Sequence, residues 1–249
     1  MPDLEPLRWS NLRNMARSPA HYLWALSRGV TQTPAMRLGW LAHARTFNTG
    51  GYSVWEGDRR GKAWNEYKAD HGTENVVTAA EILTADAIAL AVKSDPVAAP
   101  LLEGITEERI AWKIGDRECS GTPDVRTAHV LVDLKTTADA SPNRFPSYAM
   151  RAAYLAQMAW YSDGLDEGNY PVPGRICIVA VESKPPYAVC VYELTERAID
   201  MGRRTWSLLF NQLMACEAAD AWPGYSQTPV FIDAPEDSFI TIDGEEISL

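Results

Sequence analysis

The stretch Gly121-Thr122-Pro123-Asp124, followed nine residues later by Asp133-Leu134-Lys135, decides the fold that this sequence predicts. We expect residues 119–126 and 130–136 to form an antiparallel hairpin with a short connection between them. Because strand side chains alternate between faces, Asp133 and Lys135 point to one side, while Val130, Val132 and Leu134 point to the other. The apolar side can enter a core. The charged side is left to line a site that Asp124 joins from the neighbouring strand.

Two carboxylates and a lysine are the groups that metal-dependent phosphodiester hydrolysis needs. Such hydrolysis requires charge neutralisation, a deprotonated water and a stabilised leaving group. Magnesium and manganese prefer hard oxygen ligands, which Asp124, Asp133 and the main-chain carbonyl of Leu134 can supply. Lys135 would orient the attacking water and hold positive charge near the scissile phosphate. The alternative for the short pattern alone is a surface Asp-x-Lys ion pair, but the preceding Pro-Asp and the spacing favour the metal site.

Eight short motifs extend this pattern in order through most of the chain. They are Ser18-Pro19-Ala20-His21-Tyr22, Gly39 with His43, Arg59-Arg60-Gly61-Lys62 with Trp64, Gly121 with Pro123-Asp124, Asp133-Leu134-Lys135-Thr136-Thr137, Tyr154 with Gln157 and Tyr161, Val181-Glu182 with Pro186-Tyr187, and Trp222-Pro223-Gly224-Tyr225. In these motifs the chain resembles the PD-(D/E)xK nuclease superfamily, and within it the RecE-like exonucleases (exonuclease VIII type) of phages and prophages.

The resemblance implies a fold and an activity that spacing does not imply. The fold would be α/β, a PD-(D/E)xK nuclease core with a central mixed β-sheet flanked by helices and with helical N-terminal additions. The activity would be processive 5′-to-3′ digestion of linear double-stranded DNA, with Mg²⁺ as cofactor and Mn²⁺ as a substitute, in phage-type recombination. Relatives of this type also imply double-stranded DNA ends as substrate, a ring-shaped homo-oligomer (a tetramer) and a RecT-type single-strand annealing partner.

The resemblance also adds site residues. His43 shares a helix face with Gly39, and the matching histidine of the family lies beside the metals; a partly exposed histidine is the alternative. Family members carry a glutamate near the metals on a strand that Glu108 matches, although a solvent-exposed acidic pair fits Glu108 almost as well. Gln157 and Tyr161 project together from one helix and can hydrogen-bond water or phosphate, unless they are incidental to a core helix.

Three basic residues, Arg59, Arg60 and Lys62, are predicted to contact DNA phosphates, and a solvated turn around two glycines is an equally good interpretation. The charge distribution favours a DNA-facing N-terminal part. Net charge is -10 overall. Residues 1–68 hold ten basic and five acidic side chains, whereas the remaining residues hold 13 basic and 28 acidic side chains. Such asymmetry indicates a basic surface facing phosphates, against ordinary variation in surface charge.

Length and composition favour one nuclease domain over residues 1–249, with a helical DNA-facing part at about 1–100, a catalytic core at about 105–220 and an irregular acidic tail at about 221–249. Hydrophobic content is 46% and mean hydropathy is -0.22. With no secretory signal and no apolar run near the ~18 residues of a membrane span, a cytoplasmic protein without membrane contact is expected. Four scattered cysteines argue against zinc or an iron–sulfur cluster.

The order of predicted elements is α/β. Helices are expected at 34–47, from Thr78 onward, at 147–163 and at 195–219. Strands are expected at 107–114, 117–126, 129–136, 174–182 and 187–194. Two alternatives to the exonuclease remain open at this point. The same core could act as an endonuclease or a single-strand nuclease, or the chain could be a catalytically inactive DNA-binding protein.

Overall fold

The computed structural model describes residues 5–28, 32–72, 76–226, 228–233, 239–242 and 245–248. The helices are α1 (Trp9–Leu12), α2 (Pro19–Arg28), α3 (Pro34–Phe47), α4 (Gly61–His71), α5 (Ala79–Ser94), α6 (Phe145–Arg151), α7 (Tyr154–Glu167) and α8 (Glu196–Ala219), with 3₁₀ turns η1 (Arg13–Ala16) and η2 (Ala99–Leu102). The strands are β1 (Leu7–Arg8), β2 (Ser53–Val54), β3 (Val76–Val77), β4 (Ile105–Thr106), β5 (Ile110–Ile114), β6 (Arg117–Gly121), β7 (Val125–Arg126), β8 (Val130–Thr137), β9 (Arg175–Glu182), β10 (Val189–Glu193), β11 (Phe239–Ile242) and β12 (Glu245–Ser248).

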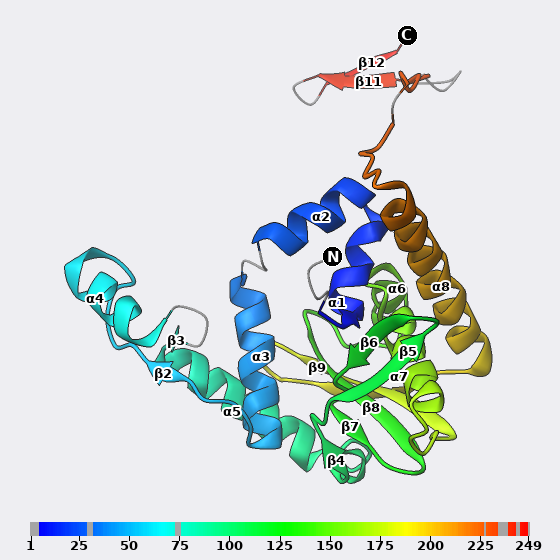
Figure 1. The fold of residues 1–249 in the computed structure, drawn as a ribbon. Helices are drawn as coiled ribbons and strands as arrows, with labels where there is room; N and C mark the ends of the chain where they lie inside the picture. The colour runs from blue at the N-terminus through cyan, green and yellow to red at the C-terminus, as the bar shows by residue number, and fades with distance from the viewer. Residues whose placement is uncertain are drawn as a thin grey trace.

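A five-stranded mixed sheet in the order β10-β9-β8-β7-β4 forms the centre of the molecule. Strands β8 and β9 run parallel, and the other neighbours in this sheet run antiparallel. A second sheet in the order β1-β6-β5 lies beside it, with helices on either side (Figure 1). The predicted architecture, a mixed sheet flanked by helices, is therefore confirmed.

Both faces of the central sheet are buried, because β8 and β9 send alternate side chains into two apolar clusters. Ile176 and Ile178 join a cluster that contains the apolar residues of α7 and α8, whereas Cys177 and Val179 join one with residues of α3 and α5. In β8, Leu134 faces the α3–α5 side with no exposure, as alternation predicts. Asp133 and Lys135 consequently face the α7 side.

Capping chemistry fixes the start of α3 and α5, the two helices that cover the opposite face. Thr33 accepts a hydrogen bond from the Met36 N–H (3.2 Å), and Pro34 begins α3. Thr78 and Glu81 form the predicted capping box at the start of α5. Glu81 also binds Arg37 of α3 at 2.7 Å, so the cap of one helix ties it to the other.

The predicted strand at 117–126 is wrong as one element. Residues up to Gly121 pair with β5, and the chain then leaves that sheet at Thr122-Pro123-Asp124 and enters the central sheet as β7. Only Val125 and Arg126 pair with β8, so the predicted hairpin is confirmed for these residues alone. Pro123 offers no N–H to a ladder, which fits its place at the point where the chain changes sheets.

The predicted helix at 147–163 is also wrong as one element, because α6 and α7 are separated at Ala152 and Ala153. Ala153 adopts a left-handed conformation with φ of 59°. Helix α7 continues through Gly164, where the prediction ends it. A Cβ at Gly164 would lie 2.7 Å from the Trp112 ring, so this glycine admits close packing and does not terminate the helix.

The C-terminal part is not wholly irregular, since β11 and β12 pair antiparallel. In Figure 1 this hairpin lies beyond α2 and the end of α8, apart from the two sheets. Within the described residues no helix combines the length and apolar character needed to cross a membrane.

Candidate active site

His43 brings α3 against the centre of the sheet. Its Nε2–H donates to the Leu134 carbonyl at 2.8 Å, and its Nδ1 lies 3.4 Å from Asp124 Oδ1. Helix α3 can approach this closely because residue 39 is glycine, where a Cβ would lie 3.1 Å from the Thr136 hydroxyl. His43 therefore lies beside Asp124 and the Leu134 carbonyl, two of the predicted metal ligands, and its own place at a metal stays a prediction.

Asp124 is held from both sides by main-chain groups. Its Oδ2 accepts a hydrogen bond from the Leu134 N–H at 2.6 Å, which joins the loop before β7 to β8. Its own carbonyl accepts from the Glu107 N–H at 3.0 Å. Glu107 has a φ of 47°, an uncommon conformation for a residue other than glycine. Sequence patterns gave no sign of this second support.

Asp133 and Lys135 form the second half of the site. Asp133 is 1% exposed, and its Oδ2 lies 2.5 Å from Lys135 Nζ. Its Oδ1 accepts from Gln157 Nε2 at 3.2 Å, and the same amide nitrogen lies 3.0 Å from the hydroxyl of Tyr161. The predicted joint projection of Gln157 and Tyr161 is confirmed. Gln157 reaches the carboxylate that the lysine binds, and Tyr161 is joined to that carboxylate through Gln157.

Burial and charge determine how these groups titrate. Burial raises the pKa of Asp133 to about 6, although Lys135 opposes the rise. Burial alone would raise the pKa of Asp124 as well, yet His43 and Lys135 hold it below its usual value. For His43 burial would lower the pKa, and the Asp124 carboxylate raises it. The site thus holds two buried carboxylates whose negative charge draws protons and cations.

The donor set fits a hard divalent cation. Two carboxylates and a main-chain carbonyl are oxygen ligands of the type that magnesium and manganese prefer, and both carboxylates are buried, with Asp124 hydrogen-bonded to the main chain of β8, the strand of Asp133. In the described residues, no three His, Cys, Asp or Glu side chains converge closely enough to hold an ion alone. Magnesium commonly retains water ligands and binds substrate phosphate, so an incomplete protein shell is compatible with it.

Tyr154 is a site neighbour that the analysis of individual residues missed. Its ring centroid lies 4.8 Å from Lys135 Nζ, within the range of a cation–π contact. It stands at the first position of α7, immediately after the left-handed Ala153. The motif that contains Gln157 and Tyr161 includes Tyr154, which was the available signal.

Glu108 lies elsewhere. Its carboxylate pairs with the Arg126 guanidinium, and its side chain is half exposed. Strand β5 begins only at Ile110, so Glu108 precedes the strand that was expected at 107–114. Its role as a metal ligand stays a prediction, and the structure joins it to Arg126 instead of to Asp124 or Asp133.

The three predicted DNA-contacting residues lie near α4, on the arm that extends away from the sheets in Figure 1. Arg59 Nη2 donates to Glu81 at 2.9 Å, Arg60 pairs with Asp58 at 2.9 Å and Lys62 with Glu66 at 3.5 Å. All three cations already have carboxylate partners. Their predicted role in binding DNA is untested.

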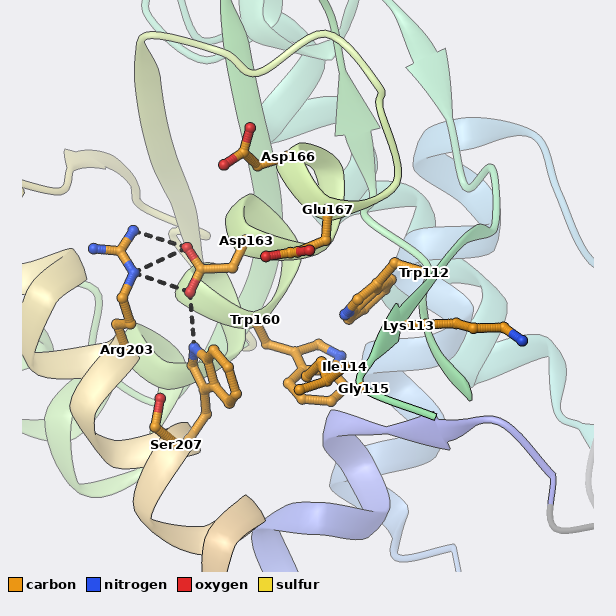
Figure 2. A pocket seen from close by; sticks show the side chains of 11 residues that line it. Trp112, Lys113, Ile114, Gly115, Trp160, Asp163, Asp166, Glu167, Arg203 and Ser207 are labelled. Atoms are coloured by element: carbon orange, nitrogen blue, oxygen red, sulfur yellow. Dashed lines mark hydrogen bonds and ion pairs between the residues drawn. The ribbon is translucent and has the colours of Figure 1, made fainter. Parts of the chain in front are cut away.

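A cavity lies outside the predicted site, against another face of α7. It has a volume of about 510 Å³, and Trp112, Trp160, Asp163 and Arg203 contribute to its walls (Figure 2). Asp163 accepts hydrogen bonds from Arg203 and from the Trp206 indole. None of the predicted catalytic residues lines this cavity, so its size does not mark it as the reactive centre.

Comparison with known proteins agrees with the fold. The family model described as a PDDEXK-like domain of unknown function (DUF3799) matches residues 9–234. The crystal structure of a "Putative exonuclease" from Eubacterium rectale is similar with a TM-score of 0.67 and 12% identity, over 93% of this chain and 90% of that chain. This likeness concerns the fold alone.

A second solved structure, SSO0001, aligns at 13% identity over 80% of this chain and 85% of that chain. Its TM-score of 0.29 is too low to support an argument. Comparison with curated proteins finds no match.

Proposed function

Because this chain belongs to the family of PDDEXK-like domains described as DUF3799, we propose that it is a metal-dependent DNA exonuclease. Its substrate would be linear double-stranded DNA, digested from the 5′ end. The observation that carries the proposal is the meeting of Asp124, Asp133 and Lys135 in one buried group, with His43 and Gln157 hydrogen-bonded or close to it. A surface ion pair would not explain carboxylates that are 9% and 1% exposed.

Asp124, Asp133 and the Leu134 carbonyl would hold the metal ion, with His43 at its side. Once bound there, such an ion supplies neutralisation of phosphate charge and a water of lowered pKa. Burial would lower the pKa of Lys135, but Asp133 and Asp124 raise it, so the lysine stays a cation. It can therefore hold positive charge beside a scissile phosphate. The resemblance supports magnesium, with manganese as a substitute.

Gln157 and Tyr161 would orient water and phosphate without adding charge. Burial raises the pKa of Tyr161 to about 12, which keeps the hydroxyl a neutral donor. The Gln157 amide is already fixed between this hydroxyl and Asp133. The Tyr161 hydroxyl, whose oxygen accepts from that amide, is therefore a preorganised donor, which is worth more than a mobile one because it needs no reorientation during the reaction.

The biological setting is part of the same proposal. We propose a role in phage-type DNA recombination, with a single-strand annealing protein of RecT type as partner and a ring-shaped homo-oligomer as the working form. The resemblance of the eight motifs supports these three statements. The similarity of fold to the structure described as a "Putative exonuclease" supports the choice of exonuclease within this proposal.

The test compares linear duplex DNA with covalently closed circular duplex in magnesium, for the wild type and Lys135→Ala. We expect the wild type to digest the linear substrate only, and Lys135→Ala to digest neither substrate. Lys113→Ala is the matched control, because Lys113 is an exposed lysine paired with Glu118 at 3.4 Å, away from the predicted catalytic residues. Cutting of the circle would identify an endonuclease on the same core. No hydrolysis of either substrate, in magnesium or manganese, would overturn the proposal in favour of a binding protein.

A further inference from the structure

Residues 6–55 contain no aspartate or glutamate in a chain that has 33 acidic residues. The same stretch contains six arginines at positions 8, 13, 17, 28, 37 and 45. It covers β1, α1, η1, α2 and α3. Such a one-sided stretch gives a surface of fixed positive charge, which is the electrostatic mark of a phosphate-binding face.

The arginines of this stretch fall into two groups. Arg37 and Arg45 pair with Glu81 and Asp86 of α5, so they have a structural role between helices. Arg8, Arg13, Arg17 and Arg28 are exposed, and in the described part of the chain none of them pairs with a carboxylate. Their positive charge is available to an external anion.

One of the available arginines shares a face of α2 with aromatic side chains, and a second lies just before that helix. His21, Trp24 and Arg28 follow one another on α2 at intervals of three and four residues, the spacing of neighbours on one helix face. Arg17 lies two residues before α2 begins at Pro19. We call these four residues the α2 face. Arg17, His21 and Trp24, with Ala20, line a cavity of about 360 Å³.

The C-terminal part supports the α2 face. The Pro223 carbonyl accepts from the Ala20 N–H at 3.1 Å, and the Trp222 ring stacks on Tyr22 with centroids 6.0 Å apart. The Tyr225 hydroxyl accepts from Arg17 Nε at 2.9 Å. This contact holds an exposed tyrosine, 75% accessible, beside the arginine and the histidine.

The same N-terminal layer reaches the predicted catalytic group through η1. The Tyr154 ring contacts Lys135. Burial raises the pKa of the Tyr154 hydroxyl, and the positive charge of Arg13 opposes this rise by a smaller amount. Arg13 is the first residue of η1, and η1 leads directly into α2. Along the chain, Arg13 therefore begins η1, Arg17 lies just before α2, and Arg28 is the last residue of α2.

Trp24 determines which form of DNA suits this surface. Its side chain is 62% exposed, and Leu23 and Leu26 beside it are 38% and 46% exposed. An exposed indole can stack on a base only where that base is unpaired, because the faces of duplex bases are already stacked. Arginines on the same face contact phosphates of any sequence.

We propose that the α2 face binds single-stranded DNA, with Trp24 stacked on a base and with Arg17 and Arg28 on neighbouring phosphates. The proposal rests on the proposed function, because an exonuclease that digests one strand of a duplex generates single-stranded DNA next to its reactive site. It goes beyond that function by assigning the surface that holds this strand. The predicted contacts at Arg59, Arg60 and Lys62 lie near α4, on the arm that extends away from the sheets in Figure 1.

Binding of a fluorescent oligothymidylate in EDTA tests the proposal, since no hydrolysis is needed. Trp24→Ala should weaken binding by roughly tenfold or more, the expected loss of one stacked base. Trp24→Phe should retain most of the affinity, because phenylalanine also stacks. Arg28→Ala should reduce the slope of log affinity against log salt by about 1. Arg204→Ala on α8 is the matched control, an exposed arginine outside the acid-free stretch.

Equal oligonucleotide affinity of Trp24→Ala and Arg204→Ala would overturn the proposal, provided that thermal unfolding shows both variants to be folded. So would an oligomer that dissociates in Trp24→Ala while its protomers bind the oligonucleotide normally, because Trp24 would then be a contact between copies of the chain. The two proposals fail separately. Oligonucleotide binding that depends on Trp24, without hydrolysis of any DNA, would contradict the exonuclease and support the α2 face.

Discussion

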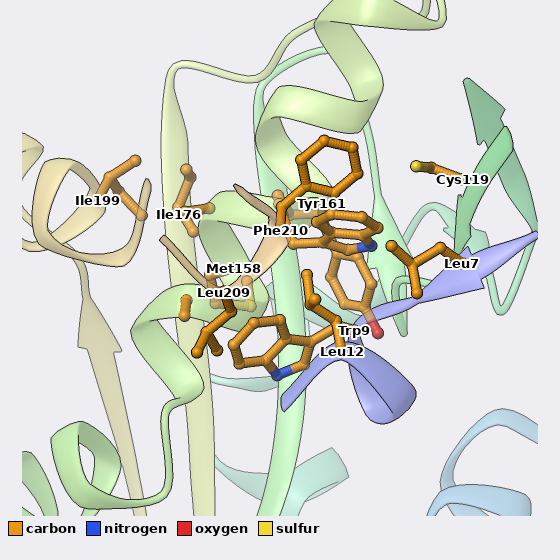
Figure 3. Close-up of a cluster of buried hydrophobic side chains, with 14 of the residues drawn as sticks. Leu7, Trp9, Leu12, Cys119, Met158, Tyr161, Ile176, Ile199, Leu209 and Phe210 are labelled. Carbon is orange, nitrogen blue, oxygen red and sulfur yellow. The ribbon is translucent and has the colours of Figure 1, made fainter. Parts of the chain in front are cut away.

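Gly121 ends β6 at the point where the Tyr161 ring packs against the main chain. A Cβ at this position would lie 2.7 Å from two ring carbons of Tyr161. Ordinary carbon contacts are about 3.5–4.0 Å, so Gly121→Ala should push the ring away by about 1 Å. The ring is 8% exposed and belongs to the apolar cluster that contains Leu12 and Phe210 (Figure 3), which leaves it little room to move.

The displacement should reach the reactive group, because the Tyr161 hydroxyl is 3.0 Å from the Gln157 amide that binds Asp133. Overpacking typically costs about 1–3 kcal/mol, which for a chain of this length corresponds to a fall in Tm of roughly 2–12 °C. A misplacement of about 1 Å can reduce a rate about a hundredfold. We expect Gly121→Ala to reduce the rate about a hundredfold and to lower Tm by roughly 2–12 °C.

Thermal unfolding and nucleotide release from linear duplex DNA, measured on the same samples, provide the check. Gly174→Ala is the control, since a Cβ at Gly174 meets no atom within 4 Å. Wild-type rate and wild-type Tm in Gly121→Ala would refute the reasoning that Gly121 and Tyr161 position Gln157.

Three further predictions concern the fold and the site. Gly202→Ala should lower Tm by more than Gly121→Ala, because its Cβ would lie 2.2 Å from the Leu155 carbonyl oxygen, and an equal or higher Tm would show that α8 can move away from α7. Glu81→Gln should lose about 1–2 kcal/mol of stability at neutral pH through the helix cap and the Arg37 pair. Burial would raise the pKa of Glu81, but the Thr78 N–H and two arginines lower it. The wild type should therefore be more stable than Glu81→Gln by the full amount above the ordinary glutamate pKa of about 4.3, and this stability difference should vanish as pH falls through the lowered pKa. Urea unfolding at several pH values checks this, and a stability difference that does not change with pH would contradict it. Gln157→Leu should reduce the rate of nucleotide release by roughly ten- to a hundredfold with little change in Tm, and an unchanged rate would remove Gln157 from the site.

The parts of the fold that the sequence predicted are those set by local pattern. Helix α3 has the predicted bounds because a threonine cap and a proline define its start. In β8, alternation alone separates Asp133 and Lys135 from the apolar residues of the α3–α5 cluster. The association of Asp124 with β8 followed from pairing of Val125 with Val132.

The parts that the sequence did not predict depend on contacts between distant segments. The change of sheet between Gly121 and Val125 is invisible in a run that reads as one strand. The break at Ala153 carries no glycine or proline signal, and Gly164 is selected by the Trp112 ring and not by a helix end. Contact between α2 and Trp222-Pro223 joins residues about two hundred positions apart, for which no local pattern exists.

The central claim is that the buried carboxylates hold a divalent metal for DNA hydrolysis. The direct measurement is nucleotide release from linear duplex DNA, in magnesium and in EDTA, by the wild type, Asp124→Asn and the exposed control Glu118→Gln. Asparagine can still accept the Leu134 N–H, so Asp124→Asn should still fold, with a lower Tm because the charge that His43 and Lys135 stabilise is lost. The account predicts release by the wild type and Glu118→Gln in magnesium alone, and a loss of about a hundredfold or more in Asp124→Asn. Equal release in EDTA, or a folded Asp124→Asn with wild-type activity, would contradict it.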